Sequence, residues 1–391
     1  MDDHATTPVD PRVLEAMLPY FTEEFGNAAS VDHLHGHTAQ QAVEHARASV
    51  AKNIGASDPE AIIFTSGATE SDNIAVIGTA EAYASKGNHI IVSAIEHKAV
   101  LDSAKYLEGR GIEVTVLPVD RYGMVDPDDV AHAITDRTLL VSVMFANNEI
   151  GTIEPVAEIG RITRDRGVLF HTDAAQAVGH IPVDVEAMNI DLLSISGHKM
   201  YGPKGIGVLY ARRRRPRAKP SAVIHGGGHE RGMRSGTLNV PGIVGLAKAL
   251  ELAVAELETE VPRLRDLTDS MLRRIQDDFP GAERNGHPHD RLPGNLNVYM
   301  PGVESRALVL ELNELVSFST GSACTTAVVE PSHVILALGF GEQRAHESVR
   351  FGLGRFTEPS DVSTVAGNVA NAAVRLAGLA GFVGASSVGS S

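Results

Sequence analysis

Short apolar runs alternate with segments of helical periodicity from Ala61 onward, and this alternation constrains the fold more than any other feature. The apolar runs, which have the length of buried strands, occur at 61–65, 89–93, 113–119, 139–145, 168–172, 191–196 and 208–210. The intervening segments with a helical pattern occur at 74–86, 98–109, 127–134 and 159–166. Strands that alternate with helices predict an α/β fold with a parallel sheet, whose functional residues lie at the carboxyl ends of the strands.

Polar residues directly follow several of these runs. They are Glu96–His97, Asn147–Glu149, His171–Asp173 with Gln176, and Ser196–Lys199. Taken singly, each is more often a helix cap or a turn residue. Because the ends of parallel strands share one edge of a sheet, together they predict a single pocket. A carboxylate such as Asp173 is suited to hold a proton on a ring nitrogen, and a histidine such as His97 can lie flat on an aromatic ring.

Lys199 is the candidate for a reacting amine in this pocket. It follows the apolar run 191–196 and a turn at Gly197. A lysine at a strand end near apolar groups is partly desolvated, which lowers its pKa and favours Schiff-base formation. A surface lysine in a loop fits the same residues equally well, so this stretch alone leaves the choice open.

Small residues join the first strand to the helix that follows it. The segment Ser66–Asn73 places free backbone N–H groups and a positive helix end at one point, an arrangement that suits a phosphate group. An ordinary capped helix start is the alternative.

Composition narrows the classes of function. The chain has 391 residues, of which 43% are hydrophobic, and this size predicts two domains or one large domain with a smaller attachment. A net charge of -15 argues against stable binding to nucleic acid or to anionic membranes. The single cysteine, Cys324, excludes an internal disulfide. With no signal peptide and no apolar run of membrane-spanning length, we expect a cytoplasmic protein.

Three further stretches carry polar or charged clusters. His33, His35 and His37 lie two residues apart but lack the companions of a metal motif, so we expect no metal site from them. The basic run Arg212–Arg217 predicts a solvated loop, with contact to an acidic partner or RNA left open. The glycine-rich stretch 225–237 has no periodicity, which is typical of a functional loop.

The C-terminal part is predicted to form a smaller α+β domain that begins near residue 255. We expect helices at 8–25, 40–54, 243–257, 262–279 and 362–379, and strands at 295–299 and 316–319. Cys324 is flanked by glycine and hydroxyl residues, which suggests exposure. Arg350 and Arg355 offer guanidinium groups for a carboxylate, with surface ion pairs as the alternative.

Six motifs together resemble the cysteine desulfurases that supply sulfur for iron–sulfur clusters, within the class V aminotransferase family of pyridoxal-phosphate enzymes. The motifs are Phe64–Asn73, Glu96–Val100, Asn147–Gly151, Ser196–Gly205, Gly226–Thr237, and Gly321–Cys324 with Glu330–His333. The resemblance extends from Ala5 to about Thr357. It implies fold type I of the pyridoxal-phosphate-dependent transferases, with a mostly parallel seven-stranded sheet in a large domain at 15–254. Residues 1–14 and 255–380 would form the small domain, and 381–391 a disordered tail.

The resemblance also implies roles for individual residues. Lys199 would hold the cofactor covalently and move the substrate's α-proton, Cys324 would be the nucleophile, and His97 would stack on the cofactor ring and act in catalysis. Arg350, with Asn148, would bind the carboxylate of L-cysteine. The implied cofactor-binding residues are Ala68, Thr69, His97, Asn148, Asp173, Gln176, Ser196, His198, Lys199 and, from a neighbouring subunit, Thr237. Among them, Gln176 and Asn148 would address the phenolic oxygen of the cofactor ring.

The implied activity converts L-cysteine to L-alanine and leaves the sulfur on Cys324 as a persulfide. The expected partners are a second copy of the chain and an iron–sulfur scaffold protein or other sulfur acceptor, with tRNA thiolation as a further destination. No metal site is expected from this chain alone, apart from contact of Cys324 with a transient iron–sulfur cluster. The stretch Met1–His4 departs from the aromatic-Leu-Asp sequence usual in the family, and a Gly/Ser tail replaces the extended C-terminal arm of some relatives.

Two classes of rival function use the same residues, another pyridoxal-phosphate reaction and a non-catalytic sulfur carrier. A transaminase or a selenocysteine lyase shares the fold, but a transaminase does not need Cys324. A sulfur carrier that has lost catalysis does not need Lys199, Asp173 and His97.

Overall fold

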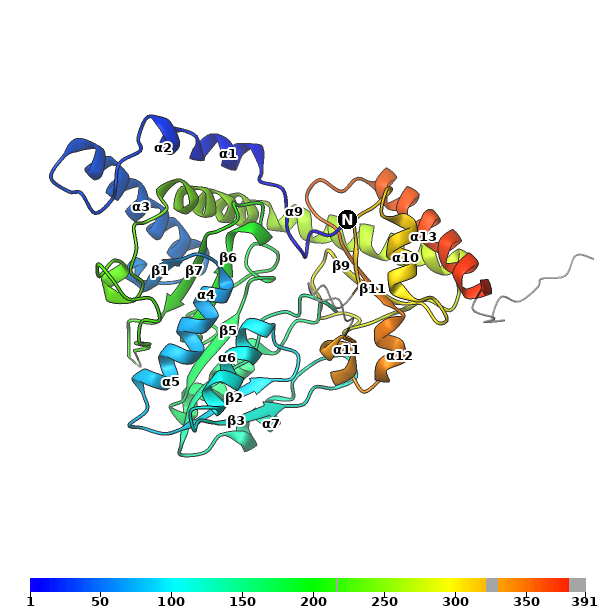
Figure 1. Cartoon of the computed structure of the whole chain (residues 1–391), viewed down its shortest axis with the longest axis horizontal. Coiled ribbons are helices and arrows are strands. Elements are labelled where there is room, and N and C mark those ends of the chain that lie inside the picture. The colour runs from blue at the N-terminus through cyan, green and yellow to red at the C-terminus, as the bar shows by residue number, and fades with distance from the viewer. Residues whose placement is uncertain (216, 321–329, 380–391) are drawn as a thin grey trace, which may run out of the picture.

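The computed structural model describes residues 1–215, 217–320 and 330–379. Cys324 and the predicted tail at 381–391 lie outside the described residues. Figure 1 shows two parts, one around a large sheet and one around a smaller sheet, with the long helix α9 extending through both. No helix among the described residues is both long and apolar enough to cross a membrane.

The large sheet has seven strands in the order β1-β7-β6-β5-β4-β2-β3. The strands are β1 Ile62–Thr65, β2 His89–Ser93, β3 Glu113–Leu117, β4 Thr138–Ser142, β5 Leu169–Asp173, β6 Leu192–Ser196 and β7 Gly207–Ala211. Neighbours from β3 to β6 pair in parallel, whereas β7 runs antiparallel to β6 and β1. The predicted α/β fold with a mostly parallel sheet is therefore confirmed.

Both faces of this sheet are covered, which explains why most of its strands are continuous apolar runs. Ile62 and Phe64 point into the cluster that includes α3, α8 and the first part of α9, whereas Ile63 faces α6 and the helical segment at 74–80. The helices of this part are α1 Pro11–Met17, α2 Pro19–Thr22, α3 Leu34–Asn53, α4 Ala68–Asn73, α5 Thr79–Ala82, α6 Lys98–Glu108, α7 Pro127–Ala133 and α8 Val156–Arg166. Short 3-10 turns occur at Pro59–Ala61, Gly197–Lys199 and Glu230–Gly232, and a π-helical turn joins α4 to α5 at Ile74–Gly78.

Three helices of this part differ from the sequence prediction. Helix α3 begins at Leu34, six residues before the predicted start at residue 40. The helix expected at 8–25 is divided into α1 and α2, because Pro19 cannot continue the hydrogen bonds of α1. The helix expected from Ile74 begins at Ala68 instead, so its first turn is the stretch considered for phosphate binding.

Helix α9, Val240–Asp278, is a single helix of 39 residues where the sequence predicts two. Pro262 lies inside it without ending it. Apolar residues up to Ala253 belong to the hydrophobic core around the large sheet, and those from Leu264 onward belong to the core around the small sheet. The helix is therefore shared by both hydrophobic cores, and the domain boundary predicted near residue 255 lies within it.

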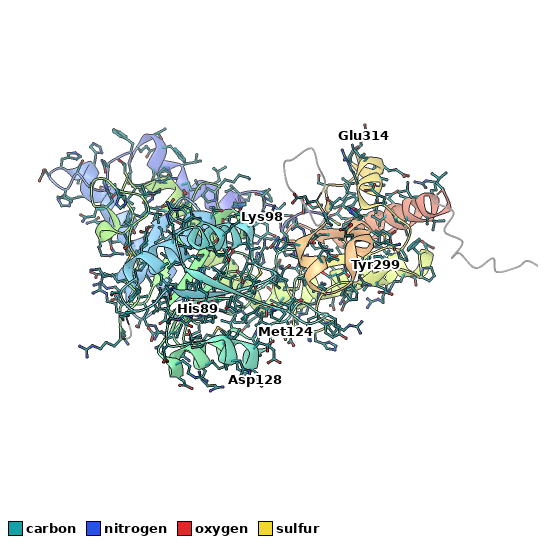
Figure 2. All side chains as sticks on the ribbon, turned by 60° about the horizontal axis from the view of Figure 1, so that its bottom comes forward. His89, Lys98, Met124, Asp128, Tyr299 and Glu314 are labelled. Carbon is teal, nitrogen blue, oxygen red and sulfur yellow. The ribbon has the colours of Figure 1, made fainter. Side chains whose placement is uncertain are left out.

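The small sheet has four antiparallel strands in the order β10-β11-β9-β8. They are β8 Glu283–Arg284, β9 Asn295–Tyr299, β10 Ser319–Thr320 and β11 Ser348–Gly352. The remaining helices are α10 Ser305–Leu312, α11 His333–Ala337, α12 Gly341–His346 and α13 Pro359–Leu379. The sequence patterns predicted β9 but not β11. Figure 2 shows Tyr299 of β9 in this part, and His89 of β2 and Asp128 of α7 in the part with the large sheet.

A buried ion pair ties the glycine-rich loop to the large sheet. Both guanidinium NH groups of Arg47 donate to Glu230 at 2.8 Å, and one also donates to the carbonyl of Ile62 at 2.7 Å. Glu230 in turn accepts from the backbone N–H of Phe64 at 2.8 Å. Glu230 and Arg231 both have positive φ angles, 47° and 57°. The ion pair thus holds a strained turn in place.

Replacing Arg47 by alanine should strongly destabilise the protein. The side chains of Arg47 and Glu230 are each 2% exposed, so the change leaves a buried carboxylate without its cation. We expect a loss of about 3–5 kcal/mol in the free energy of unfolding, measured by urea denaturation. The control Arg161→Ala removes an exposed ion pair with Asp165 and should change little. Equal effects of the two substitutions would contradict this role for Arg47.

Candidate active site

A cavity of about 610 Å³ lies at the carboxyl ends of the large sheet's strands. It brings together ten of the predicted site residues, although they come from separate parts of the chain. They are Ala68, Thr69, His97, Asn148, Asp173, Gln176, Ser196, His198, Lys199 and Arg350. Thr237 does not line this cavity and is exposed. Cys324 lies outside the described residues.

Lys199 ends the 3-10 turn that follows β6. Its Nζ donates to the carbonyl oxygens of His4 at 2.6 Å and Ala5 at 2.7 Å. Burial, together with the positive charge of Arg350, lowers the pKa of Lys199 to about 8. An amine with this pKa is largely cationic at neutral pH but loses its proton readily.

Asp173 is the last residue of β5, and its side chain is buried at the cavity wall. One oxygen accepts from the backbone N–H of Ala175 at 2.9 Å. Burial raises the pKa of Asp173, and the nearby His97 and Lys199 oppose that rise. Asp72 lies fully buried close by, and its own pKa is raised by burial and by the charge of Asp173. A cationic N–H that donated to Asp173 would stabilise its charged form.

The turn between β1 and α4 leaves open space beside the cavity. A side chain at Gly67 would meet no atom within 4 Å, and its φ of 156° suits glycine. A Cβ at Gly207 would lie 2.6 Å from the Cα of Gly67, so the two backbones approach too closely for a larger residue at position 207. Ser196 and His198 line the same cavity from β6 and the turn after it. The first turn of α4 therefore presents its backbone to the cavity, as a phosphate site requires.

His97 is an exposed residue at the start of α6, where its Nδ1 accepts from the backbone N–H of Ala99 at 3.2 Å. An exposed ring at the cavity wall is free to stack on a planar ligand. Asn148 also lines the cavity, and its carbonyl oxygen accepts from Arg350.

Arg350 and Arg355 differ in their surroundings. Arg350, on β11, is buried and donates to the carbonyl of Asn148 at 3.0 Å and to Asp2 at 2.9 Å. Its Nε is buried and has no hydrogen-bond partner among the described residues. Arg355 pairs instead with Asp10 and Glu256 and does not line the cavity. Of the two arginines predicted to bind a carboxylate, Arg350 lines the cavity and Arg355 does not.

The N-terminal segment forms part of the wall, which the residue patterns did not predict. His4 and Ala5 line the cavity, and Asp2 bonds to Arg350. The sequence did offer one signal for this segment. Met1–His4 departs from the aromatic-Leu-Asp opening that is usual in the family.

The three neighbouring histidines are not arranged as a metal site. His33 caps α3 by accepting from the backbone N–H of Gly36 at 3.1 Å, and His35 stacks on Phe25 with ring centroids 5.3 Å apart. Within the described part of the chain, the group able to offer three ligand atoms to one ion is Asp72, His97 and Asp173. That group belongs to the cavity described above.

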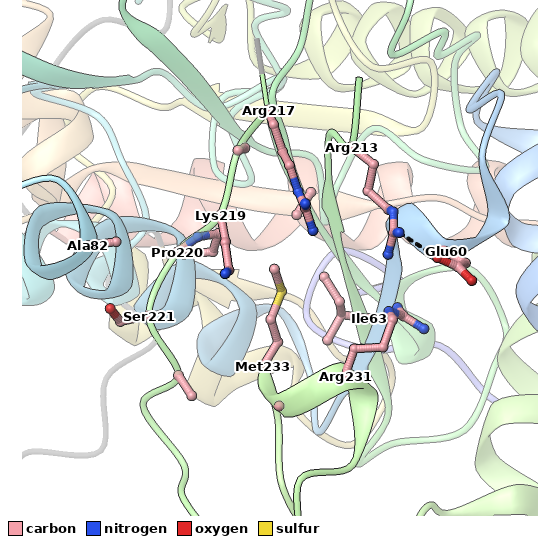
Figure 3. A pocket seen from close by; sticks show the side chains of 14 residues that line it. Glu60, Ile63, Ala82, Arg213, Arg217, Lys219, Pro220, Ser221, Arg231 and Met233 are labelled. Atoms are coloured by element: carbon pink, nitrogen blue, oxygen red, sulfur yellow. Dashed lines mark ion pairs between the residues drawn. The ribbon is translucent and has the colours of Figure 1, made fainter. Parts of the chain in front are cut away.

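The basic run is only partly a solvated loop. Arg212 is buried and donates to the carbonyl of Ile190, and Arg213 pairs with Asp58 and Glu60. A second cavity of about 460 Å³ lies beside this run, away from the candidate active site. Figure 3 shows Arg213, Arg217, Lys219 and Arg231 around it, with Arg213 paired to Glu60. The prediction of an acidic or RNA partner for this run stays a prediction.

Comparison with known proteins gives one consistent family. The model of the aminotransferase class-V family matches residues 1–365. A cysteine desulfurase IscS from Anaeromyxobacter dehalogenans is 57% identical over 93% of this chain and 89% of that relative. Among solved structures, a NifS-like protein superimposes with a TM-score of 0.88 at 37% identity over 95% of this chain and 97% of its own. A structure described as SspA in complex with cysteine has a TM-score of 0.80 at 37% identity over 90% and 97% of the two chains.

The chain therefore belongs to the class V aminotransferase family, and within that family it groups with the cysteine desulfurases. The resemblance seen in the six motifs is confirmed. The roles of the individual residues and the domain boundaries stay predictions.

Membership of this family implies dependence on pyridoxal phosphate, and the cavity fits that group. Its wall offers a lysine with a lowered pKa, a buried carboxyl able to pair with a ring nitrogen, and a helix start for a phosphate. All of these features line the same cavity.

The pKa of Lys199 predicts how the amine titrates in protein freed of cofactor. Labelling of Lys199 by acetic anhydride, followed by mass spectrometry, should rise with a midpoint near pH 8. In Arg350→Gln the midpoint should move up by roughly half a pH unit, because removing a neighbouring positive charge makes the ammonium form easier to keep.

Arg355→Gln is the matched control, since the Arg355 side chain is only 11% exposed but lies outside the cavity. It should leave the midpoint of Lys199 unchanged. An unchanged or lower midpoint in Arg350→Gln would show that Arg350 does not act on Lys199.

Proposed function

We propose that this chain is a cysteine desulfurase that converts L-cysteine to L-alanine and transfers the sulfur to Cys324 as a persulfide. One observation carries the proposal: Lys199, with a lowered pKa, shares one cavity with the buried Asp173 and Arg350. This combination provides a base, a partner for a ring nitrogen and a cation for the substrate carboxylate.

Pyridoxal phosphate, when bound, supplies an electron sink that makes the substrate's α-proton removable. Backbone N–H groups of Ala68 and Thr69, with Ser196 and His198, would hold its phosphate, and Thr237 of the partner subunit would join them. Burial and the charge of Lys199 lower the pKa of His198 to about 4, so this residue would bind as a neutral ring.

The residues of this chain divide the remaining tasks. Arg350 lines the cavity and binds the carboxylate of L-cysteine through its guanidinium group. Lys199 takes the α-proton, since an amine with a pKa near 8 can accept and return a proton at neutral pH. Asp173 keeps a proton on the ring nitrogen, and His97 covers the ring.

Sulfur transfer requires a thiolate and balances without an added oxidant. The Cys324 thiolate forms a bond to the substrate's sulfur, and the bond from that sulfur to the β-carbon breaks. The electron pair of the broken bond stays with the carbon skeleton, which gains a proton and leaves as L-alanine. The product on the protein is a persulfide of Cys324.

The wider setting follows from the same activity. We propose an iron–sulfur scaffold protein as the main sulfur acceptor, with tRNA thiolation as a further destination and the cytoplasm as the location.

The working unit is proposed to be a homodimer, because Thr237 is exposed and does not line the cavity of its own chain. Light scattering of the cofactor-loaded, active protein should give twice the chain mass, and a monomeric mass would refute the dimer.

Turnover of L-cysteine tests the activity directly. The purified, cofactor-loaded protein should form L-alanine and, with a thiol reductant present, sulfide. Cys324→Ala should keep the visible absorption of bound cofactor but lose sulfide formation by at least a hundredfold, because the transfer has no acceptor thiol. Lys199→Ala should lose both products.

Two other results would redirect the assignment. Equal sulfide release by Cys324→Ala would exclude the persulfide route and favour a lyase acting on the same fold. Amino-group transfer to a keto acid without sulfide would indicate a transaminase.

A further inference from the structure

His4 is a buried residue in the N-terminal segment with direct contacts to two site residues. Its side chain is 6% exposed, and its Nδ1 lies 2.8 Å from Oε1 of Gln176. Its carbonyl oxygen accepts from Nε2 of Gln176 at 3.0 Å and from Nζ of Lys199 at 2.6 Å. One residue thus contacts both the amide and the amine on the cavity wall.

The paired contacts determine which atoms carry hydrogen. A carbonyl oxygen only accepts, so the amide atom that faces the His4 carbonyl must be the nitrogen of Gln176. The amide oxygen of Gln176 then faces Nδ1 of His4, which must carry the proton and donate. His4 is therefore the Nδ1–H tautomer, and its Nε2 carries no hydrogen.

The ring is held neutral by its surroundings. Burial, with the positive charge of Arg350, lowers the pKa of His4 to about 3. Its Nε2 is buried and has no hydrogen-bond partner among the described residues, so no contact there requires a proton on this nitrogen.

The contacts to His4 also fix what Gln176 can offer to a ligand. Its side chain makes both of its hydrogen bonds, within the described part of the chain, to His4. One amide hydrogen is used by the His4 carbonyl, so one N–H is left to donate. If the amide were turned over, its oxygen would face the carbonyl oxygen of His4, which is unfavourable.

The N-terminal segment holds His4 rigidly in this position. The backbone N–H of Asp3 donates to the carbonyl of Gly352 at 3.1 Å, and that of Gly352 donates to Met1 at 3.0 Å. A Cβ at Gly352 would lie 2.6 Å from the backbone nitrogen of His4, so the two segments are in close contact. The position of the His4 ring is therefore set by β11 and not by Gln176 alone.

We propose that His4 is a positioning residue that fixes the amide of Gln176 with its free N–H toward the phenolic oxygen of the bound cofactor. The proposal rests on the proposed function and on the role that the family resemblance implies for Gln176, which is contact with that oxygen. A donor at the phenolic oxygen stabilises the negative charge on that oxygen. It therefore favours the form of the cofactor that has lost the proton next to this oxygen. His4 thereby lowers the pH at which the bound cofactor changes colour.

Two substitutions at position 4 separate positioning from packing. His4→Phe keeps the volume of a ring but cannot donate to Gln176. His4→Asn leaves a smaller side chain whose amide nitrogen takes the place of Nδ1 and can donate. The measurement is a pH titration of the visible absorption band, with the dissociation constant of the cofactor measured alongside.

For a positioning role we expect the colour change of His4→Phe to move up by about one pH unit and its cofactor binding to weaken about tenfold. His4→Asn should stay within about a third of a pH unit of the parent. The opposite order, with His4→Phe like the parent and His4→Asn shifted, would show that the ring only fills space and would overturn the proposal. Equal shifts in both variants would overturn it as well.

A double variant tests whether His4 acts through Gln176. If it does, adding His4→Phe to Gln176→Ala should produce no further shift, whereas additive shifts would overturn the proposal. If His4→Phe does not fold, His4→Ala takes its place in the same comparison. The titration needs bound cofactor but no desulfurase activity, so failure of the proposed function would appear separately, as absent L-alanine formation by the parent protein.

Discussion

The confinement of one amine at the carboxyl edge of the large sheet is the constraint on which the site depends. Lys199 is partly withdrawn from water, lies near the positive charge of Arg350, and is met by the carbonyl oxygens of His4 and Ala5. Desolvation and like charge weaken its hold on a proton, while the carbonyl groups keep it in place. Proton transfer near neutral pH follows from this balance.

The N-terminal segment connects the two parts of the molecule around that amine. Asp2 binds Arg350 of the small sheet, whereas Thr7 accepts a hydrogen bond from the backbone of Tyr201 just after Lys199. Helix α9 joins the same two parts through both hydrophobic cores. Arg350 belongs to the small sheet and Lys199 to the turn after β6, so their separation depends on these connections and on direct contacts such as the hydrogen bond from Arg350 to the carbonyl of Asn148. A change in any of these contacts is expected to alter the charge balance at Lys199.

Local patterns predicted much of the fold and of the site. β2 and α6 were predicted within a residue, because buried strands and amphipathic helices have distinct periodicities. The patterns were wrong where packing overrides local preference: Pro262 does not divide α9, because tertiary packing onto both cores supports the helix on either side of it. β11 was missed because it pairs with β9, which lies about 50 residues earlier in the chain, and no turn signal joins the two strands. The contacts of His4 were missed because their partners are also distant in the sequence.

Periodicity and motifs are local properties of the chain, and they were enough to predict the alternation of strands and helices around the large sheet, the placement of Asp173 and Lys199 at strand ends, and the family. Which distant groups meet was set by tertiary packing. The contact between Lys199 and His4 joins residues 195 positions apart, and Arg350 reaches Asp2 across 348. Likewise, only packing separated the roles of Arg350 and Arg355, which are close in sequence. Such contacts depend on how whole segments fold back on one another, and burial at those meeting points sets the pKa of Lys199.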